Sequence, residues 1–150
     1  MKKPKTDIEW KIYRDRLEQK KKKLYERYKN RQKAKYESSP NHYLQQVEFS
    51  NRSGSHVNCF RYFPNNSEEH ECLKFLIFRL LRDAGHLILT EPIFKDRSRC
   101  DILDLSTGTI IEILHSEKLE DAKKKAKKYP SCFQVRFIST GKKLDFDEVL

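Results

Sequence analysis

The acidic residues Asp101 and Glu112 stand among branched apolar residues in the segment 100–114, CDILDLSTGTIIEIL. With residues 107–108 as the turn of an antiparallel hairpin, Leu103 pairs with Glu112. The two acids then become diagonal neighbours on one face of the hairpin, with backbone positions about 7–8 Å apart. Carboxylates at this separation can hold one hard cation, so the spacing predicts a site for Mg²⁺ or Mn²⁺.

Each acid also has a structural explanation that needs no function. At a hydrated strand end, Asp101 would form an ion pair with Arg97 or Arg99. Glu112 lies in the middle of TIIEILH, where every neighbour indicates a covered strand and an unpaired charge is costly to bury. The structural explanation is weaker for Glu112, so the pair taken together favours a functional role.

A helix before the hairpin supplies a third acid. It is predicted from residue 66 or 67 to Ala84. Counting back from Leu80 along its apolar face, in steps of four and three residues, leads to Glu69. Glu68 and Glu71 are instead predicted on the outer side. The buried face is predicted to consist of Leu73, Leu76, Ile77, Leu80, Leu81 and Ala84.

Glu69 has a structural explanation as well. It lies near the helix N-terminus, where the macrodipole favours an anion, and it has capping-box spacing from Asn66. His70 and Lys74 share a neighbouring face, four residues apart.

Short apolar runs predict four strands, and a lysine-rich stretch predicts a second helix. The strands are predicted from 86 to about 92, at 99–105, at 109–115 and at 132–140, and the helix at 117–129, with Ser116 as its cap. The resulting order of helix, three strands, helix and strand indicates an α/β body.

The N-terminal region differs in composition from this body. Residues 1–36 carry 15 Lys and Arg against 5 acids, whereas the remaining 114 residues carry 17 of each. Residues 6–36 predict a helix whose narrow apolar stripe contains Trp10, Tyr13, Leu17, Leu24 and Tyr28. The helix is either a solvated element docked along one seam or a binding arm for a polyanion such as nucleic acid.

Four parts are therefore predicted along the chain. They are a basic helical arm at 1–38, a connector at 39–65, a body at 66–140 and a polar tail at 141–150. Within the connector, residues 43–49 and 56–63 predict a β-hairpin.

Cysteine spacing and hydropathy exclude other classes of protein. Cys59, Cys72, Cys100 and Cys132 are isolated, so zinc motifs and redox CxxC motifs are absent from the sequence. No apolar run approaches the ~20 residues of a membrane span, and the first residues lack the apolar core of a signal peptide. We expect free thiols and an intracellular location, without membrane attachment.

The order of elements, Glu69, Asp101 and the triplet EIL at 112–114 together resemble the PD-(D/E)XK nuclease superfamily. The likeness covers 66–140 and is greatest to small nuclease-like proteins of archaeal viruses and plasmids, with a resolvase-like core. It implies a restriction-endonuclease-like αβββαβ core with a mixed sheet, and a metal-dependent DNA endonuclease. It also implies that Asp101 and Glu112 bind the metal, with Glu69 as the acid of the first helix.

One position departs from the pattern of that superfamily. Leu114 stands where the third triplet residue is usually a lysine that positions or activates the attacking water. Lys74 is the first candidate to replace it, and His70 belongs to the same candidate site. His115 should point away from the site by strand alternation, unless the strand already ends there, and it is a candidate catalytic base, supporting residue or phosphate contact.

The basic residues are candidates for nucleic-acid binding. They are Lys20, Lys21, Lys22, Lys23, Arg27 and Arg31 of the arm and Lys123, Lys124 and Lys127 of the second helix. DNA is the expected partner, although RNA presents the same phosphates, and a homodimer would supply the two sites that cutting both strands needs. Two alternatives remain: a catalytically silent nuclease-fold protein that binds nucleic acid, and an assembly protein that oligomerises through its N-terminal helix.

Overall fold

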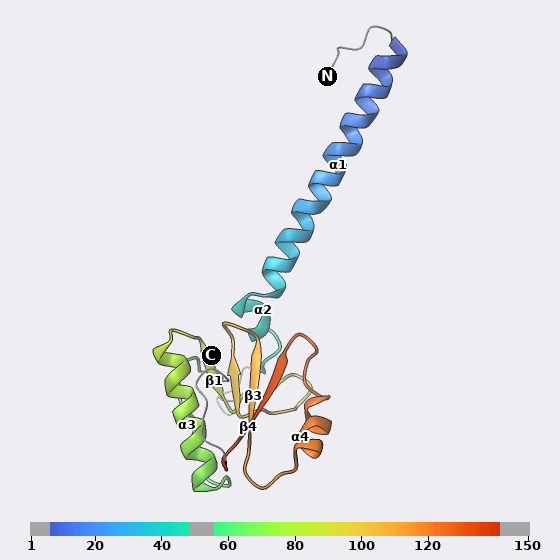
Figure 1. Cartoon of the computed structure of the whole chain (residues 1–150). Coiled ribbons are helices and arrows are strands. Elements are labelled where there is room, and N and C mark those ends of the chain that lie inside the picture. The colour runs from blue at the N-terminus through green and yellow to red at the C-terminus, as the bar shows by residue number, and fades with distance from the viewer. Residues whose placement is uncertain (1–6, 49–55, 142–150) are drawn as a thin grey trace. The chain divides into compact units, whose positions relative to one another are not determined.

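One long helix makes up most of the first of two compact units in the chain. The computed structural model describes residues 7–48 and 56–141, and the chain divides into units 1–36 and 37–150. Helix α1 spans Asp7–Glu37, as the sequence predicts (Figure 1). In its apolar stripe, Leu24 and Tyr28 are 63% and 61% exposed, so this part of the stripe is not covered.

The second unit is built on a four-stranded mixed sheet. Strands β1 (Ile88–Thr90), β2 (Ile102–Asp104), β3 (Thr109–Leu114) and β4 (Gln134–Ser139) lie in the order β1-β2-β3-β4. The first three are antiparallel neighbours, and β4 is parallel to β3. The parallel connection runs through a helix, as parallel pairs usually require.

Helices cover the two faces of this sheet. Helix α3 (Glu68–Asp83) packs on one face, and α4 (Leu119–Ala126) lies on the other side (Figure 1). Alternate strand residues feed two apolar clusters: Ile111 and Ile113 join Ile77 of α3, whereas Ile110 joins Tyr129, which follows α4. The predicted element order and the α/β class are therefore confirmed.

The β2–β3 hairpin has a different register from the predicted one. Leu103 pairs with Ile110, and Asp104 pairs with Thr109 across a four-residue loop. The Asp104 carboxylate accepts hydrogen bonds from Ser106 N and Thr107 Oγ1 within this loop, at 2.9 and 2.7 Å, and stabilises the longer turn. The shift amounts to two residues, so every side chain keeps its predicted face.

The buried face of α3 is rotated relative to the prediction. Phe78 and Lys74 are buried and Leu76 is 51% exposed, because the stripe that packs on the sheet follows Leu81, Ile77, Lys74 and His70. Glu69 is therefore exposed, contrary to the prediction that it continues the buried face. Ser67 caps this helix as predicted, accepting a hydrogen bond from His70 N at 3.2 Å.

Two other predicted boundaries are wrong. Strand β1 ends at Thr90 rather than near Pro92, because Glu91 adopts a positive φ of 53° that interrupts the ladder. Helix α4 is shorter than predicted, and Lys118 rather than Ser116 occupies its N-cap, without a side-chain hydrogen bond.

The predicted connector hairpin is also wrong. Ser39 and Pro40 begin a short helix, α2 (Pro40–Leu44), because proline is well suited to the first helical position. Val47 then forms only an isolated bridge with Phe94, and residues 56–63 form no strand. The predicted turn of this hairpin lies outside the described residues, as does most of the predicted tail. No helix in the described part of the chain is long and apolar enough to cross a membrane.

Candidate functional site

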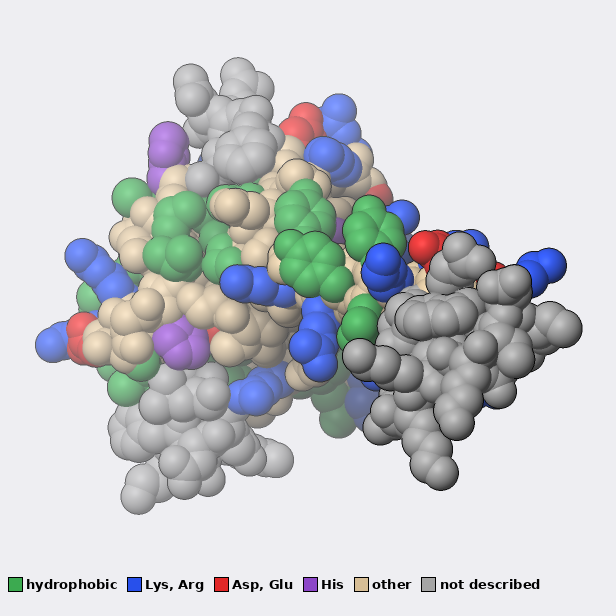
Figure 2. Space-filling model, turned by 90° about the horizontal axis from the view of Figure 1, so that it is seen from above, with side chains coloured by type: hydrophobic (Ala, Val, Ile, Leu, Met, Phe, Trp, Pro, Cys, Tyr) green, Lys and Arg blue, Asp and Glu red, His purple; other side chains and the backbone are tan. Residues whose placement is uncertain are grey.

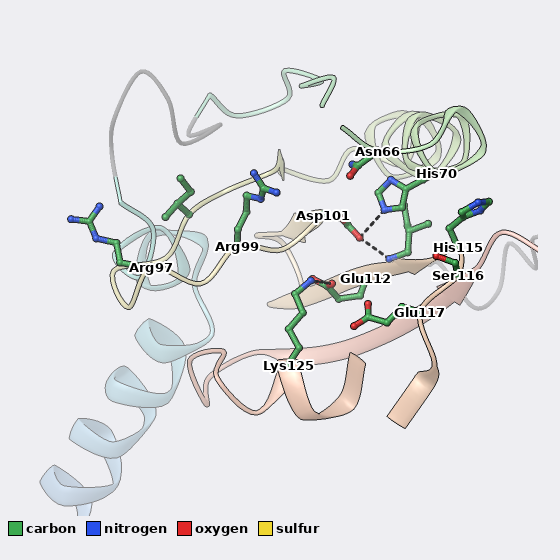
Figure 3. Close-up of a pocket in the computed structure, with 12 residues that line it drawn as sticks. Asn66, His70, Arg97, Arg99, Asp101, Glu112, His115, Ser116, Glu117 and Lys125 are labelled. Carbon is green, nitrogen blue, oxygen red and sulfur yellow. Dashed lines mark hydrogen bonds and ion pairs between the residues drawn. The ribbon is translucent and has the colours of Figure 1, made fainter. Parts of the chain in front are cut away.

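A pocket of about 590 Å³ lies where α3, β3 and α4 approach the segment that precedes β2. Figure 3 shows His70, Asp101, Glu112 and Lys125 pointing toward one another within it. The charged groups and histidines of the lining are His70, Arg97, Arg99, Asp101, Glu112, His115, Glu117 and Lys125.

Asp101 is held at the edge of β2 by groups from two other elements. Its Oδ2 atom accepts a hydrogen bond from Ile113 N of β3 at 2.8 Å. His70 Nε2 of α3 lies 3.3 Å from the same oxygen. Neither Arg97 nor Arg99 pairs with Asp101, because these arginines contact Glu48 and Glu91 instead, each at 3.2 Å. The alternative explanation of Asp101 as an arginine ion pair is therefore wrong.

Glu112 is buried in the middle of β3, and protein groups contact both of its carboxylate oxygens. Tyr129 Oη donates a hydrogen bond to Oε1 at 2.6 Å, and Lys125 Nζ donates one to Oε2 at 2.9 Å. Extending the observed register by one residue puts Asp101 directly opposite Glu112. The predicted convergence of these two acids on one face is confirmed, as direct rather than diagonal neighbours.

Burial and neighbouring charges separate the pKa values of the two acids. Burial raises the pKa of Glu112, the Asp101 charge raises it further, and Lys125 and Tyr129 offset this only in part. Burial also acts to raise the pKa of Asp101, but the hydrogen bonds from His70 and Ile113 N outweigh it and leave the pKa lowered. At a given pH, Asp101 is therefore ionised more readily than Glu112.

The cations beside these acids have raised pKa values. Burial acts to lower the pKa of Lys125, but Glu112 outweighs it. Likewise, burial lowers the pKa of His70, and its hydrogen bond and charge contact with Asp101 reverse the direction. The charged forms of Lys125 and His70 are thus favoured by their acidic neighbours.

Lys74, the first candidate to replace the missing lysine, lies outside the lining of the pocket. Its side chain has no exposed surface, and its Nζ contacts Glu71 Oε1 at 2.5 Å and Glu91 Oε1 at 2.7 Å. Glu71, predicted on the outer side of α3, is 4% exposed. Lys74 therefore belongs to a buried ionic cluster and does not line the pocket.

The predicted site residues Glu69 and His115 lie at the margin of the pocket. Glu69 is exposed and does not line it. His115 does line it, which is the alternative left open for a strand that ends before this residue. Strand β3 ends at Leu114, so alternation no longer applies to His115, whose Nδ1 lies 3.1 Å from Thr140 Oγ1.

Sequence reasoning misses Lys125 and Tyr129. The narrow apolar stripe of Leu119, Ala122 and Ala126 predicts that the lysines around it are merely solvated. However, Ala122, Lys125, Ala126 and Tyr129 follow the i, i+3, i+4, i+7 spacing of one helical face. Because Ala122 is buried, that spacing could have placed Lys125 next to the sheet.

The donor chemistry of the pocket suits a hard cation. Asp101 and Glu112 offer carboxylate oxygens, which Mg²⁺ and Mn²⁺ prefer, and Mg²⁺ commonly binds one or two carboxylates while keeping several waters. Among the described residues, no group of three or more His, Cys, Asp or Glu side chains is arranged to hold a metal. The two acids therefore fit a cation bound partly by water rather than one enclosed by protein ligands.

The predicted nucleic-acid-binding residues are all exposed. Those of α1 are Lys20, Lys21, Lys22, Lys23, Arg27 and Arg31, and those of the second helix region are Lys123, Lys124 and Lys127. Figure 2 shows Lys and Arg side chains spread over the face seen from above, with few Asp or Glu side chains. On α4, Lys124 lies 2.9 Å from Asp121, so its charge is partly compensated.

Comparison with family models, with curated proteins and with solved structures finds no significant match. The function of this chain is therefore inferred from its own residues.

Proposed function

We propose that this protein is a metal-dependent endonuclease that hydrolyses phosphodiester bonds of DNA. The single observation that carries the proposal is the pair of acids, half-buried Asp101 and buried Glu112, facing one another across β2 and β3 with Lys125 beside them. The four-stranded mixed sheet with α3 and α4 on its two sides supports the proposal, because a restriction-endonuclease-like core has this order of elements.

Asp101 and Glu112 would hold the metal in this proposal. A divalent cation bound there supplies Lewis-acid polarisation of a phosphoryl oxygen and lowers the pKa of a bound water. Hydrolysis adds the oxygen of water to phosphorus and breaks one P–O ester bond, and the departing oxygen takes up a proton.

The other residues of the pocket have positioning and charge-balancing roles. His70 and Ile113 N orient the Asp101 carboxylate, and Tyr129 orients that of Glu112. Lys125 takes the place that Leu114 leaves vacant, since its ammonium group contacts Glu112 from α4. A positive charge at this point stabilises negative charge that develops on the phosphoryl group.

A second candidate function is favoured by the contacts of Glu112. Protein groups already engage both of its carboxylate oxygens, at 2.6 and 2.9 Å, so a metal would have only the remaining lone pairs of these oxygens to bind. A catalytically silent protein that binds nucleic acid would keep this arrangement permanently.

Cleavage assays distinguish the two candidates. Linear, nicked, supercoiled and four-way-junction DNA are incubated with Mg²⁺, Mn²⁺ or EDTA and with wild type, Asp101→Asn or Lys125→Met. The proposal expects metal-dependent products, with rates lowered on the order of 10²-fold in both variants. Lys128→Met, at an exposed position shortly after the same helix, is the matched control. Salt-sensitive binding by wild type with no cleavage under any metal would contradict the proposal and support the silent protein.

A further inference from the structure

Arg99 lines the pocket two residues before Asp101, in an extended segment paired with Ile93. Successive residues of an extended segment alternate in direction, with a rise of about 3.3 Å per residue. Cys100 is buried between them, so Arg99 and Asp101 lie on the same side, roughly 7 Å apart along the chain. In Figure 3 Arg99 lies between Arg97 and Asp101.

Three contacts fix the Arg99 side chain and backbone in place. Its guanidinium carbon lies 4.1 Å from the centre of the Phe63 ring, and its Nε atom lies 3.2 Å from Glu91 Oε2. The Tyr129 hydroxyl lies 3.0 Å from the Arg99 carbonyl oxygen, which ties the backbone to the residue that also contacts Glu112. Phe63 stacks on the guanidinium plane and Glu91 engages Nε, so the two terminal Nη atoms are the guanidinium donors that can reach a ligand.

The buried ionic cluster of Glu71, Lys74 and Glu91 holds the carboxylate that contacts Arg99. Glu91 is 3% exposed and adopts a positive φ of 53°. Its Oε1 atom accepts a hydrogen bond from Nζ of the fully buried Lys74 at 2.7 Å. Burying such charges is costly unless they are paired, and a residue held at positive φ stores backbone strain. Positioning Arg99 gives this cluster a role beyond balancing its own charges.

We propose that the guanidinium of Arg99 is a phosphate-binding group that holds a backbone phosphate of the nucleic acid in the part of the pocket lined by Arg99, beside Asp101 and Glu112. A guanidinium fork matches phosphate oxygens in a bidentate manner, and one fixed before binding loses less conformational entropy. The identity of the polyanion rests on the proposed function, but the phosphate site itself requires no cleavage.

Binding of a short DNA duplex in EDTA, followed by fluorescence anisotropy over a range of salt concentrations, tests this inference. Arg99→Gln should weaken binding about tenfold. The negative slope of log K against log salt should become less steep by about 1, as loss of one phosphate contact makes it. Arg99→Lys should weaken it severalfold, because the charge remains but the fork is lost. Arg79→Gln is the matched control: Arg79 on α3 is 69% exposed, pairs with Asp83 and does not line the pocket, so affinity should stay within about twofold of wild type.

Phe63→Leu guards against a folding defect of the Arg99 variants, because it removes the stacking surface and leaves every charge of the cluster in place. It should weaken binding about threefold, with circular dichroism showing an unchanged fold. Equal affinity of wild type, Arg99→Gln and Phe63→Leu, or equal losses in Arg99→Gln and Arg79→Gln, would overturn the inference. If wild type still cleaves DNA when these binding results overturn the inference, the proposed function stands and only the role of Arg99 is wrong. If binding depends on Arg99 but no cleavage is seen, the phosphate site stands and the proposed function is wrong.

Discussion

His70 and Asp101 form a charged contact whose strength depends on pH. Asp101, Glu71 and Lys74 face the His70 ring, and Asp101 is the nearest of the acids, at 3.3 Å. The pKa of His70 is raised above 6.5, so its contribution to stability is complete below about pH 6.5 and is lost as pH rises through the raised value. The pKa of Asp101 is lowered below 3.8, so its contribution is present above pH 3.8 and is lost on acidification.

Replacement of His70 by Gln should therefore have a pH-dependent cost. We expect the loss in free energy of unfolding to be largest between about pH 4 and 6.5, and smaller at pH 8.5 by on the order of 1 kcal/mol. Urea denaturation at a series of pH values measures it. In an Asp101→Asn background most of the pH dependence should vanish, and a cost that stays pH-dependent there would mean that another group is responsible.

At the scale of elements, the loop between β2 and β3 is fitted against α2. Gly108 has a φ of 71°, and a Cβ atom at this position would clash with the ring of Tyr43. Tyr43 in turn packs against Phe133, with ring centres 5.4 Å apart. The loop that sets the register of the two acids is thus fixed by a contact with a residue more than sixty positions earlier in the sequence.

Gly108→Ala should destabilise the protein by roughly 2–4 kcal/mol, because backbone strain and a steric clash add together. Urea denaturation measures the effect. Gly85→Ala is the matched control. Gly85 also has a positive φ, 85°, but among the described residues no atom lies within 4 Å of the place that a Cβ atom would take. Only the strain of about 1–2 kcal/mol then remains. Equal costs for the two substitutions would show that Tyr43 does not restrict this loop.

The sequence predicts the order of elements well, because each element is short and bounded by Gly, Pro or polar residues. It also predicts that Asp101 and Glu112 share a face, because a period of two survives any register shift by two residues. It does not predict the shift itself, which depends on Asp104 bonding within its own loop. The predicted face of α3 is wrong because Lys74 and Glu71 are polar yet buried, and the ion pairs of Lys74 with Glu71 and Glu91 make that burial tolerable.

At the scale of the whole molecule, positive charge is concentrated in the first unit. Residues 1–36 account for the entire formal net charge of +10, since the remaining residues are balanced. A helix with this charge attracts a polyanion through counterion release, which carries no sequence information. We therefore expect α1 to contribute affinity for nucleic acid rather than a choice among sequences.

Replacing Lys20, Lys21, Lys22 and Lys23 by Gln should lower the slope of log K against log salt by about 1 for each lysine that contacts a phosphate. Affinities for unrelated DNA sequences should fall by similar factors. Arg79→Gln, which removes an exposed charge paired with Asp83 on α3, serves as the control. An unchanged slope in the fourfold variant would show that α1 does not contact nucleic acid.

The proposed function depends above all on Asp101 and Glu112 binding one divalent cation together. Isothermal titration calorimetry with Mn²⁺ tests this most directly, on wild type, Asp101→Asn and Glu112→Gln, with unfolding curves to verify that each variant is folded. We predict one site per chain in wild type and affinity weaker by about tenfold or more in each variant, because each loses one of the two carboxylate ligands. Binding of equal strength in all three proteins, or no Mn²⁺ binding by wild type, would contradict a metal site at these two acids.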